Sequence, residues 1–97
     1  MKIIWSPLAL EQINEIVDYI AQENPKAAER TAIELFSAVE RLEKFSESER
    51  IVPELSRSNI REIILRKYRI LYRIEAKQIS ILTVRHARQH LQSDDIV

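Results

Sequence analysis

The sequence contains no cysteine and no glycine, and it has two histidines. Without cysteine the chain has no disulfide, thiolate zinc site or cysteine nucleophile, and it is compatible with a reducing cytosol. Without glycine it lacks the loops in which a backbone closely approaches a phosphate or a dinucleotide. Two histidines are also few ligands for a metal ion. We therefore expect no metal centre and no cofactor.

Long apolar runs are missing too. The longest is a few residues, far short of the ~20 residues that span a bilayer, and the start MKIIWSP lacks the longer apolar core of a secretory signal. We expect a cytoplasmic protein that does not enter a membrane. With 97 residues, of which 45% are hydrophobic, the chain fits one domain, residues 1–97, with one core.

A formal net charge of zero hides two halves of opposite sign. Residues 1–56 carry six basic and eleven acidic side chains, a formal charge of −5. Residues 57–97 carry nine basic and four acidic side chains, a formal charge of +5. The sequence therefore predicts an electrically polarised molecule with a basic C-terminal part.

The N-terminal half predicts a short strand at residues 2–5 followed by two helices. Ser6 and Pro7 suit a cap and a first helical position, and Asn24 and Pro25 repeat that signal. The first helix should end before Pro25, and the second should run to about residue 45. The connection is so short that the helices must be antiparallel neighbours. Their apolar stripes lie at helical spacing: Ala9, Ile13, Ile16, Val17 and Ile20, then Ala28, Ala32, Leu35, Val39 and Leu42.

The C-terminal half alternates apolar and basic residues, which is typical of strands. We expect strands at about 60–66, 68–74 and 78–85, with a turn at 75–77. The predicted fold is α+β: an N-terminal strand and an antiparallel helical hairpin packed on a small twisted sheet that ends in a three-stranded antiparallel meander. The alternation of residues along the last two expected strands predicts which side chains share a face of the sheet. Ile70, Tyr72 and Ile74 share the face that also carries Tyr68, and Leu82, Val84 and His86 oppose Ile81, Thr83 and Arg85.

The remaining sheet face should carry the arginines together as one cationic surface. Such a face either keeps an open sheet soluble or meets a partner. Glu62 points away from its neighbour Arg61, so it could bond across to Arg69 or Arg73. His86 either closes the core at the end of the last strand or acts as an acid or base.

Five segments in this order resemble the RelE/ParE superfamily of bacterial toxins. They are WSPLAL, YIAQENPKAA, RIVPEL, IREIILRKYRILYRI and ISILTVRHAR, and together they cover residues 1 to about 90. The resemblance implies a toxin encoded beside an antitoxin, whose extended and helical tail wraps the toxin and silences it. One position departs from the pattern, because relatives often place glycine before Tyr68 and this chain has Lys67.

The long helical hairpin and the ending RHAR look more like the ParE branch, whose characterised members poison DNA gyrase. On this interpretation the chain has no catalytic group, and it forms a hetero-oligomer with an antitoxin and contacts gyrase or a related topoisomerase. Its predicted partner-binding residues are the cations of the strands and of the C-terminal end: Arg61, Arg69, Arg73, Arg85, His86 and Arg88.

Two alternatives stay open. RelE-like relatives cut messenger RNA on the ribosome, a reaction that needs a base, an acid and cations over the developing phosphate charge. The candidates for that chemistry are Arg61, Arg66, Arg69, Arg85 and His86. A second acid or base is hard to find, because Ala87 follows His86 where some ribonuclease relatives have a tyrosine. The third possibility is an inactive relative that only binds an antitoxin.

Overall fold

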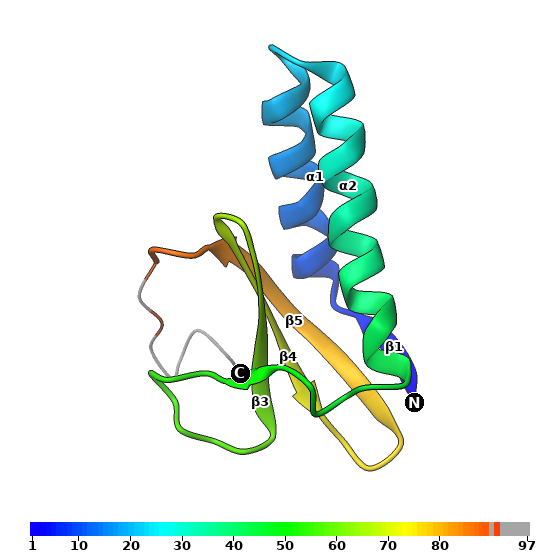
Figure 1. The fold of residues 1–97 in the computed structure, drawn as a ribbon, viewed down its shortest axis with the longest axis vertical. Coiled ribbons are helices and arrows are strands. Elements are labelled where there is room, and N and C mark those ends of the chain that lie inside the picture. The colour runs from blue at the N-terminus through cyan, green and yellow to red at the C-terminus, as the bar shows by residue number, and fades with distance from the viewer. Residues whose placement is uncertain (90, 92–97) are drawn as a thin grey trace.

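A computed structural model describes residues 1–89 and residue 91. A strand, β1 (Lys2–Trp5), leads into two helices, α1 (Pro7–Ala21) and α2 (Pro25–Glu40), and a 3-10 turn, η1 (Arg41–Glu43). Four strands follow: β2 (Arg50–Ile51), β3 (Ile60–Leu65), β4 (Tyr68–Ile74) and β5 (Gln78–His86). In Figure 1 the helical hairpin forms one layer and the sheet the other. The predicted α+β fold is confirmed, and β2 is an added short strand.

Both helices begin as the sequence predicts. The Ser6 Oγ accepts the N–H of Ala9 at 3.0 Å, and the Asn24 Oδ1 accepts the N–H of Ala27 at 3.1 Å. Each cap is followed by a proline whose missing N–H costs nothing at that position. The second α-helix ends at Glu40, earlier than expected, because the chain tightens into η1 before residue 45.

The sheet has the strand order β1-β5-β4-β3-β2. β1 runs parallel to β5, and the other neighbouring pairs are antiparallel, so β3, β4 and β5 form the expected meander. One face packs on the helices. The buried side chains of this main core come from both layers: Ala9, Ile13, Leu35, Ala38, Val39, Leu42, Ile63, Ile70, Tyr72, Ile79, Ile81 and Val84.

The β4–β5 pairing contains a bulge. Leu71 is opposite Thr83 and Tyr72 is opposite Ile81, so Leu82 is the extra residue on β5. As a result Ile81 and Val84 both pack in the main core, and Leu82 packs on the other face. The expectation that Leu82 and Val84 share a face is wrong, because the inserted residue shifts the alternation along the strand.

The second face is partly covered rather than open. Residues 52–59, which we call the cover loop, lie between β2 and β3. Val52 and Leu55 of this loop pack with Leu71 of β4 and with Leu91, beyond β5. The expectation of an open cationic face is therefore wrong, since this second small core and the cover loop take part of that surface.

Among residues 1–89 and 91, no helix has both the length and the apolar character needed to cross a membrane.

Candidate functional site

The end of the sheet at the β3–β4 turn brings two basic segments together. Arg66 and Lys67 form the turn between β3 and β4, and Arg66 adopts a left-handed conformation with φ of 55°. Tyr68 at the start of β4 pairs with His86 at the end of β5, and the N–H of Ala87 donates to the carbonyl of Lys67 at 2.7 Å. We call residues 66–68 and 85–88 the tip. Its two halves are joined by backbone hydrogen bonds and therefore keep a fixed relation.

His86 is exposed at the tip. Its Nδ1 accepts the backbone N–H of Arg88 at 3.2 Å, and its ring stands edge-on to that of Tyr68, with centroids 6.4 Å apart. Val84 is the last β5 side chain in the main core. The interpretation of His86 as a residue that closes the core is therefore wrong, because β5 extends beyond the layer that buries it.

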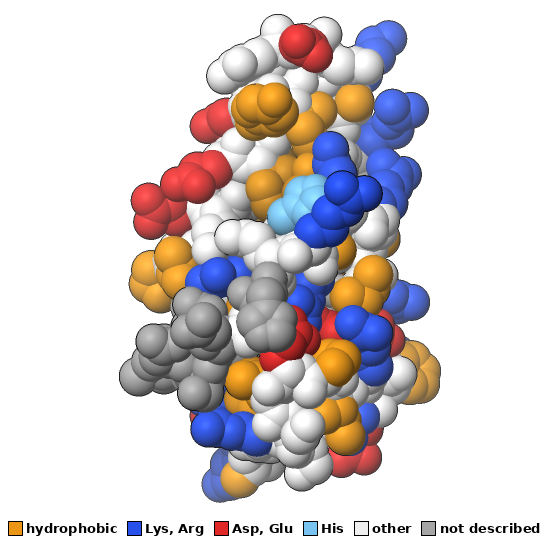
Figure 2. All heavy atoms as spheres, turned by 90° about the vertical axis from the view of Figure 1, so that its left-hand side faces the viewer, with side chains coloured by type: hydrophobic (Ala, Val, Ile, Leu, Met, Phe, Trp, Pro, Cys, Tyr) orange, Lys and Arg blue, Asp and Glu red, His pale blue; other side chains and the backbone are white. Residues whose placement is uncertain are grey.

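A groove of about 470 Å³ lies between α1 and the tip. Its α1 side includes Tyr19, which is 75% exposed. Figure 2 shows a histidine on this face with basic side chains beside it, and acidic side chains along the opposite flank. The lining mixes apolar, aromatic and charged groups: Gln12, Glu15, Ile16, Tyr19, Lys67, Tyr68, Val84, Arg85, His86 and Gln89.

A second groove, of about 330 Å³, lies on the other side of the β3–β4 turn. Arg66 lines it and donates to the carboxylate of Glu34 on α2 at 2.7 Å. That arginine is 64% exposed, so the pair contributes little to stability. The two grooves share Lys67 and Tyr68, and the Lys67 amine lies 5.8 Å from the centre of the Tyr68 ring. The β3–β4 turn is therefore accessible from both sides.

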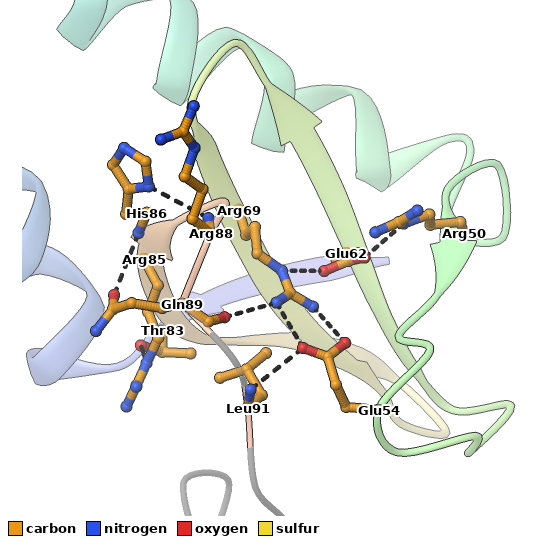
Figure 3. A network of polar contacts seen from close by, with 10 residues as sticks. All are labelled: Arg50, Glu54, Glu62, Arg69, Thr83, Arg85, His86, Arg88, Gln89 and Leu91. Carbon is orange, nitrogen blue, oxygen red and sulfur yellow. Dashed lines mark hydrogen bonds and ion pairs between the residues drawn. The ribbon is translucent and has the colours of Figure 1, made fainter.

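Arg69 is not on an open surface. It is 3% exposed, and its Nε donates to the carboxylate of Glu62, itself 1% exposed, at 2.6 Å. Nη1 and Nη2 donate to the two carboxylate oxygens of Glu54 at 2.7 and 2.9 Å, and Nη1 also donates to the carbonyl of Gln89 at 2.9 Å. Figure 3 shows this network, with Arg50 on the outer side of Glu62. Arg69 therefore holds the interior together and presents no free donor face to a phosphate or a partner.

The network shifts the pKa values of Glu54 and Arg69 so that both stay charged. Hydrogen bonding to Arg69 is the largest effect on Glu54 and lowers the pKa of that carboxyl from 4.5 to about 2. The hydrogen bond from Glu54 in turn raises the pKa of Arg69. The expected cross-strand bond between Glu62 and Arg69 is confirmed.

The other predicted arginines fall into separate places. Arg61 donates to the backbone carbonyls of Ser58, Glu47 and Glu49, and it pairs with Tyr72 at the far end of β3 from the tip. Arg73 lies at the same far end, opposite Ile60. One shared cationic surface was therefore a wrong expectation. The described structure keeps Arg66, Arg85, His86 and Arg88 at the tip.

Of the ten residues that line the groove beside α1, sequence reasoning had included only Arg85 and His86 in the candidate site, and Lys67, Tyr19 and Gln12 are among the eight that it did not include. Lys67 was noticed as a departure in the turn, and its place between two paired strands could have indicated that it lies at the tip. Tyr19 and Gln12 belong to α1, and their positions outside the apolar stripe were the available signal. Among residues 1–89 and 91, no group of His, Cys, Asp and Glu side chains is placed to hold a metal ion.

Comparison with known proteins decides the family. A family model described as the ParE toxin of the type II toxin-antitoxin system parDE matches residues 3–91. The chain belongs to the ParE toxin family. It is thus a toxin of a type II toxin-antitoxin system in the RelE/ParE superfamily, and its family implies an antitoxin partner.

Individual relatives agree with this family. The chain is 38% identical over 90 residues to the putative toxin Y4kP of Sinorhizobium fredii, covering 91% of this chain and 90% of that protein. It is 32% identical over 87 residues to toxin RelE2 of Caulobacter vibrioides, covering 89% and 94%. The fold resembles a solved chain from the chromosomal ParDE system of P. aeruginosa, with a TM-score of 0.77 at 19% identity over 91% of this chain and 97% of that one.

Proposed function

We propose that this ParE-family toxin inhibits DNA gyrase or a related topoisomerase by protein contact in the cytoplasm, and that its cognate antitoxin neutralises it in a hetero-oligomer. The tip is the proposed contact surface, through Arg85, His86 and Arg88 together with Lys67. In this proposal Arg61 and Arg73 make a separate partner contact at the far end of the sheet. Arg69 has an internal role.

The observation that carries this proposal is the dispersal of the groups that phosphate chemistry would need. Of the five ribonuclease candidates, Arg85 and His86 line one groove. Arg69 is buried in the ion network and Arg61 is held at the far end of β3. Arg66 lines the neighbouring groove and pairs with Glu34. A protein contact does not require these cations to converge on one reacting atom, whereas stabilisation of a developing charge does.

The charge of the tip also suits a protein partner with acidic side chains. Lys67 and Arg88 are exposed there, and complementary charge speeds association and makes it sensitive to salt. The groove beside α1 adds apolar and aromatic surface, including the exposed Tyr19. Aromatic residues of this kind often act as anchors in an interface.

A supercoiling assay tests the proposal directly. Toxin released from its antitoxin complex is added to gyrase, ATP and relaxed plasmid, and supercoiled product is quantified on gels. Stoichiometric toxin should block supercoiling and stabilise cleaved DNA, and antitoxin should restore activity. Unchanged supercoiling at stoichiometric and excess toxin, with correctly folded protein, would remove gyrase as the target.

One observation favours ribosome-dependent cleavage of messenger RNA as a second candidate. His86 is exposed beside Tyr68, and Arg85 and Lys67 line the same groove, so acid, base and cation types do meet there. Cleavage of translated messages in a cell-free extract, abolished by His86→Ala or Arg85→Ala, would favour this function. Induced expression that leaves growth unchanged would instead favour an inactive antitoxin-binding module.

A further inference from the structure

The cover loop and the chain after β5 are tied to each other across the second sheet face. Arg69 of β4 bonds at once to the carboxylate of Glu54 in the cover loop and to the carbonyl of Gln89 after β5. Glu54 also accepts the backbone N–H of Leu91 at 3.2 Å, and Leu91 is buried in the second core. Two segments distant in sequence are therefore fixed by one arginine.

Gln89 connects this network to the tip. Its side-chain Oε1 accepts the backbone N–H of His86 at 3.3 Å, and its own N–H donates to the His86 carbonyl at 3.0 Å. The carbonyl of the same residue accepts from Arg69. Figure 3 shows this continuous line of contacts from Glu54 through Arg69 and Gln89 to His86.

We infer that Glu54, Arg69 and the Gln89 carbonyl form a unit, which we call the clamp, that positions the tip. Both side chains are positioning residues, because they act through Gln89 on His86 and Arg88 and not by touching a partner. The chain after His86 has left the strand and is joined to the β3–β4 turn by the Ala87–Lys67 backbone bond, so a second tie through Gln89 restricts it further and lowers the cost of binding.

The chemistry of the clamp suits this role. A guanidinium presents a planar fork that matches a carboxylate in two bonds, which fixes an angle as well as a distance. Two further Arg69 donors go to Glu62 and to the Gln89 carbonyl. A lysine would offer a point charge without this geometry, so the clamp depends on arginine rather than on positive charge alone.

The conformational part of this inference is independent of the target, and its consequence for toxicity rests on the proposed function of the tip. Glu54→Gln is the primary variant, because it removes one charge and one acceptor from the clamp and leaves the buried Arg69–Glu62 pair. Arg50→Gln is its matched control. Arg50 bonds to the same Glu62 from the outer side, where its side chain is 57% exposed.

Amide hydrogen exchange of the full chain, read residue by residue by NMR, tests the clamp. In Glu54→Gln the amides of His86, Arg88 and Gln89 should exchange about tenfold faster, with His86 and Arg88 shifted in the ¹H–¹⁵N spectrum, while amides of β3 and β4 keep their protection. Arg50→Gln should leave the tip amides unchanged. Equal exchange at the tip in wild type and Glu54→Gln overturns the clamp.

Gln89→Ala separates the Gln89–His86 contact from the contacts among Glu54, Arg69 and the Gln89 carbonyl. It removes the side-chain acceptor of the His86 N–H and keeps the backbone carbonyl that Arg69 binds. Exchange should rise at His86 and stay low at Leu91, whereas Glu54→Gln raises both. Faster exchange at Leu91 in Gln89→Ala, to the level of Glu54→Gln, would contradict the order of contacts.

The supercoiling assay then tests the functional consequence. Glu54→Gln with a loosened tip should need more toxin for half-maximal inhibition than Arg50→Gln, and Glu54→Asp, which keeps a carboxylate, should recover part of the loss. Full inhibition by a loosened Glu54→Gln overturns the role of positioning in toxicity. If wild-type toxin leaves gyrase active, the proposed target fails, and the clamp is judged by the exchange data alone.

Discussion

The side-chain oxygen of Gln12 accepts the backbone N–H of Val84 at 2.7 Å. This N–H lies beyond the β1–β5 pairing, whose last partners are Trp5 and Ile81. The same Gln12 oxygen also accepts the hydroxyl of Thr83, and the hydroxyl of Ser6 donates to the Leu82 carbonyl at 3.0 Å. Side chains at the start of α1 thus replace a strand neighbour where β5 would otherwise have an unpaired edge.

Replacing Gln12 with leucine should destabilise the fold. The Val84 N–H and the buried Thr83 hydroxyl would lose their acceptor, and an unpaired buried donor costs about 1–3 kcal/mol. Urea unfolding followed by circular dichroism measures the change in the free energy of unfolding. Asn14→Leu on the exposed side of the same helix is the control. Equal losses in the two variants would show that Gln12 has no special role.

Acid should weaken the protein through Glu54. Its pKa in the folded chain is lowered to about 2 from 4.5, so the unfolded chain binds the proton more readily. The stabilisation is therefore complete above pH 4.5 and is lost as the pH falls towards 2. We expect a loss of about 1–2 kcal/mol over this range, reduced by solvent screening at the loop.

Urea midpoints measured across that pH range check this expectation. Glu54→Gln should start less stable and show a flatter decline with acid. Parallel declines in wild type and Glu54→Gln would mean that another group causes the acid sensitivity.

Tyr72 should resist ionisation. Burial, followed by the nearby charge of Glu49, raises its pKa from 10.0 to about 12, and its hydroxyl donates to the Ser46 carbonyl at 2.9 Å. Because the folded pKa lies above the unfolded one, the protonated hydroxyl stabilises the fold below pH 10 and this contribution disappears as the pH rises towards 12. Ultraviolet titration of tyrosinate should show a late step that Tyr72→Phe lacks. An unchanged titration curve in that variant would refute the assignment.

The second core should contribute to stability as much as a normal interior does. Leu71 is fully buried beneath Val52 and Leu91, so Leu71→Ala should cost about 2–5 kcal/mol in unfolding free energy. Ile64→Ala is a suitable comparison, because Ile64 is 44% exposed on β3 and should cost much less. Similar costs in calorimetry would indicate that the cover loop does not stay packed on the sheet.

The sequence was sufficient for the elements that depend on local signals. The two cap-and-proline pairs placed both helix starts, and the period of two in the C-terminal half placed every end of β3, β4 and β5 to within one residue. Ile70 and Tyr72 lie on the helical face as expected, because nothing interrupts the alternation of β4 between them. Helix starts and strand alternation can be predicted from neighbouring residues alone, without knowledge of tertiary contacts.

The sequence was not sufficient where distant segments meet. Arg69 and Leu71 alternate along β4 in the same way whether water or a loop lies above them. The local sequence pattern therefore did not indicate that the cover loop packs on this face or that Arg69 is buried. The Leu82 bulge adds one residue without a mark such as glycine or proline, and it placed Ile81 instead of Leu82 on the core side with Val84. The set of residues in the candidate site also changed because it depends on contacts between distant segments. Arg85, His86 and Arg88 stayed together, and Arg61, Arg69 and Arg73 separated from them.

The most direct measurement is gyrase inhibition by a toxin altered only at the tip. The double variant Lys67→Ala with Arg88→Ala removes two exposed charges there, and Lys2→Ala with Lys77→Ala removes two exposed charges at the other end of the sheet. The tip variant should require roughly tenfold more toxin for half-maximal inhibition of supercoiling, and the control variant should match wild type. Equal potency of the tip variant and wild type would contradict the proposal that the tip is the toxic surface.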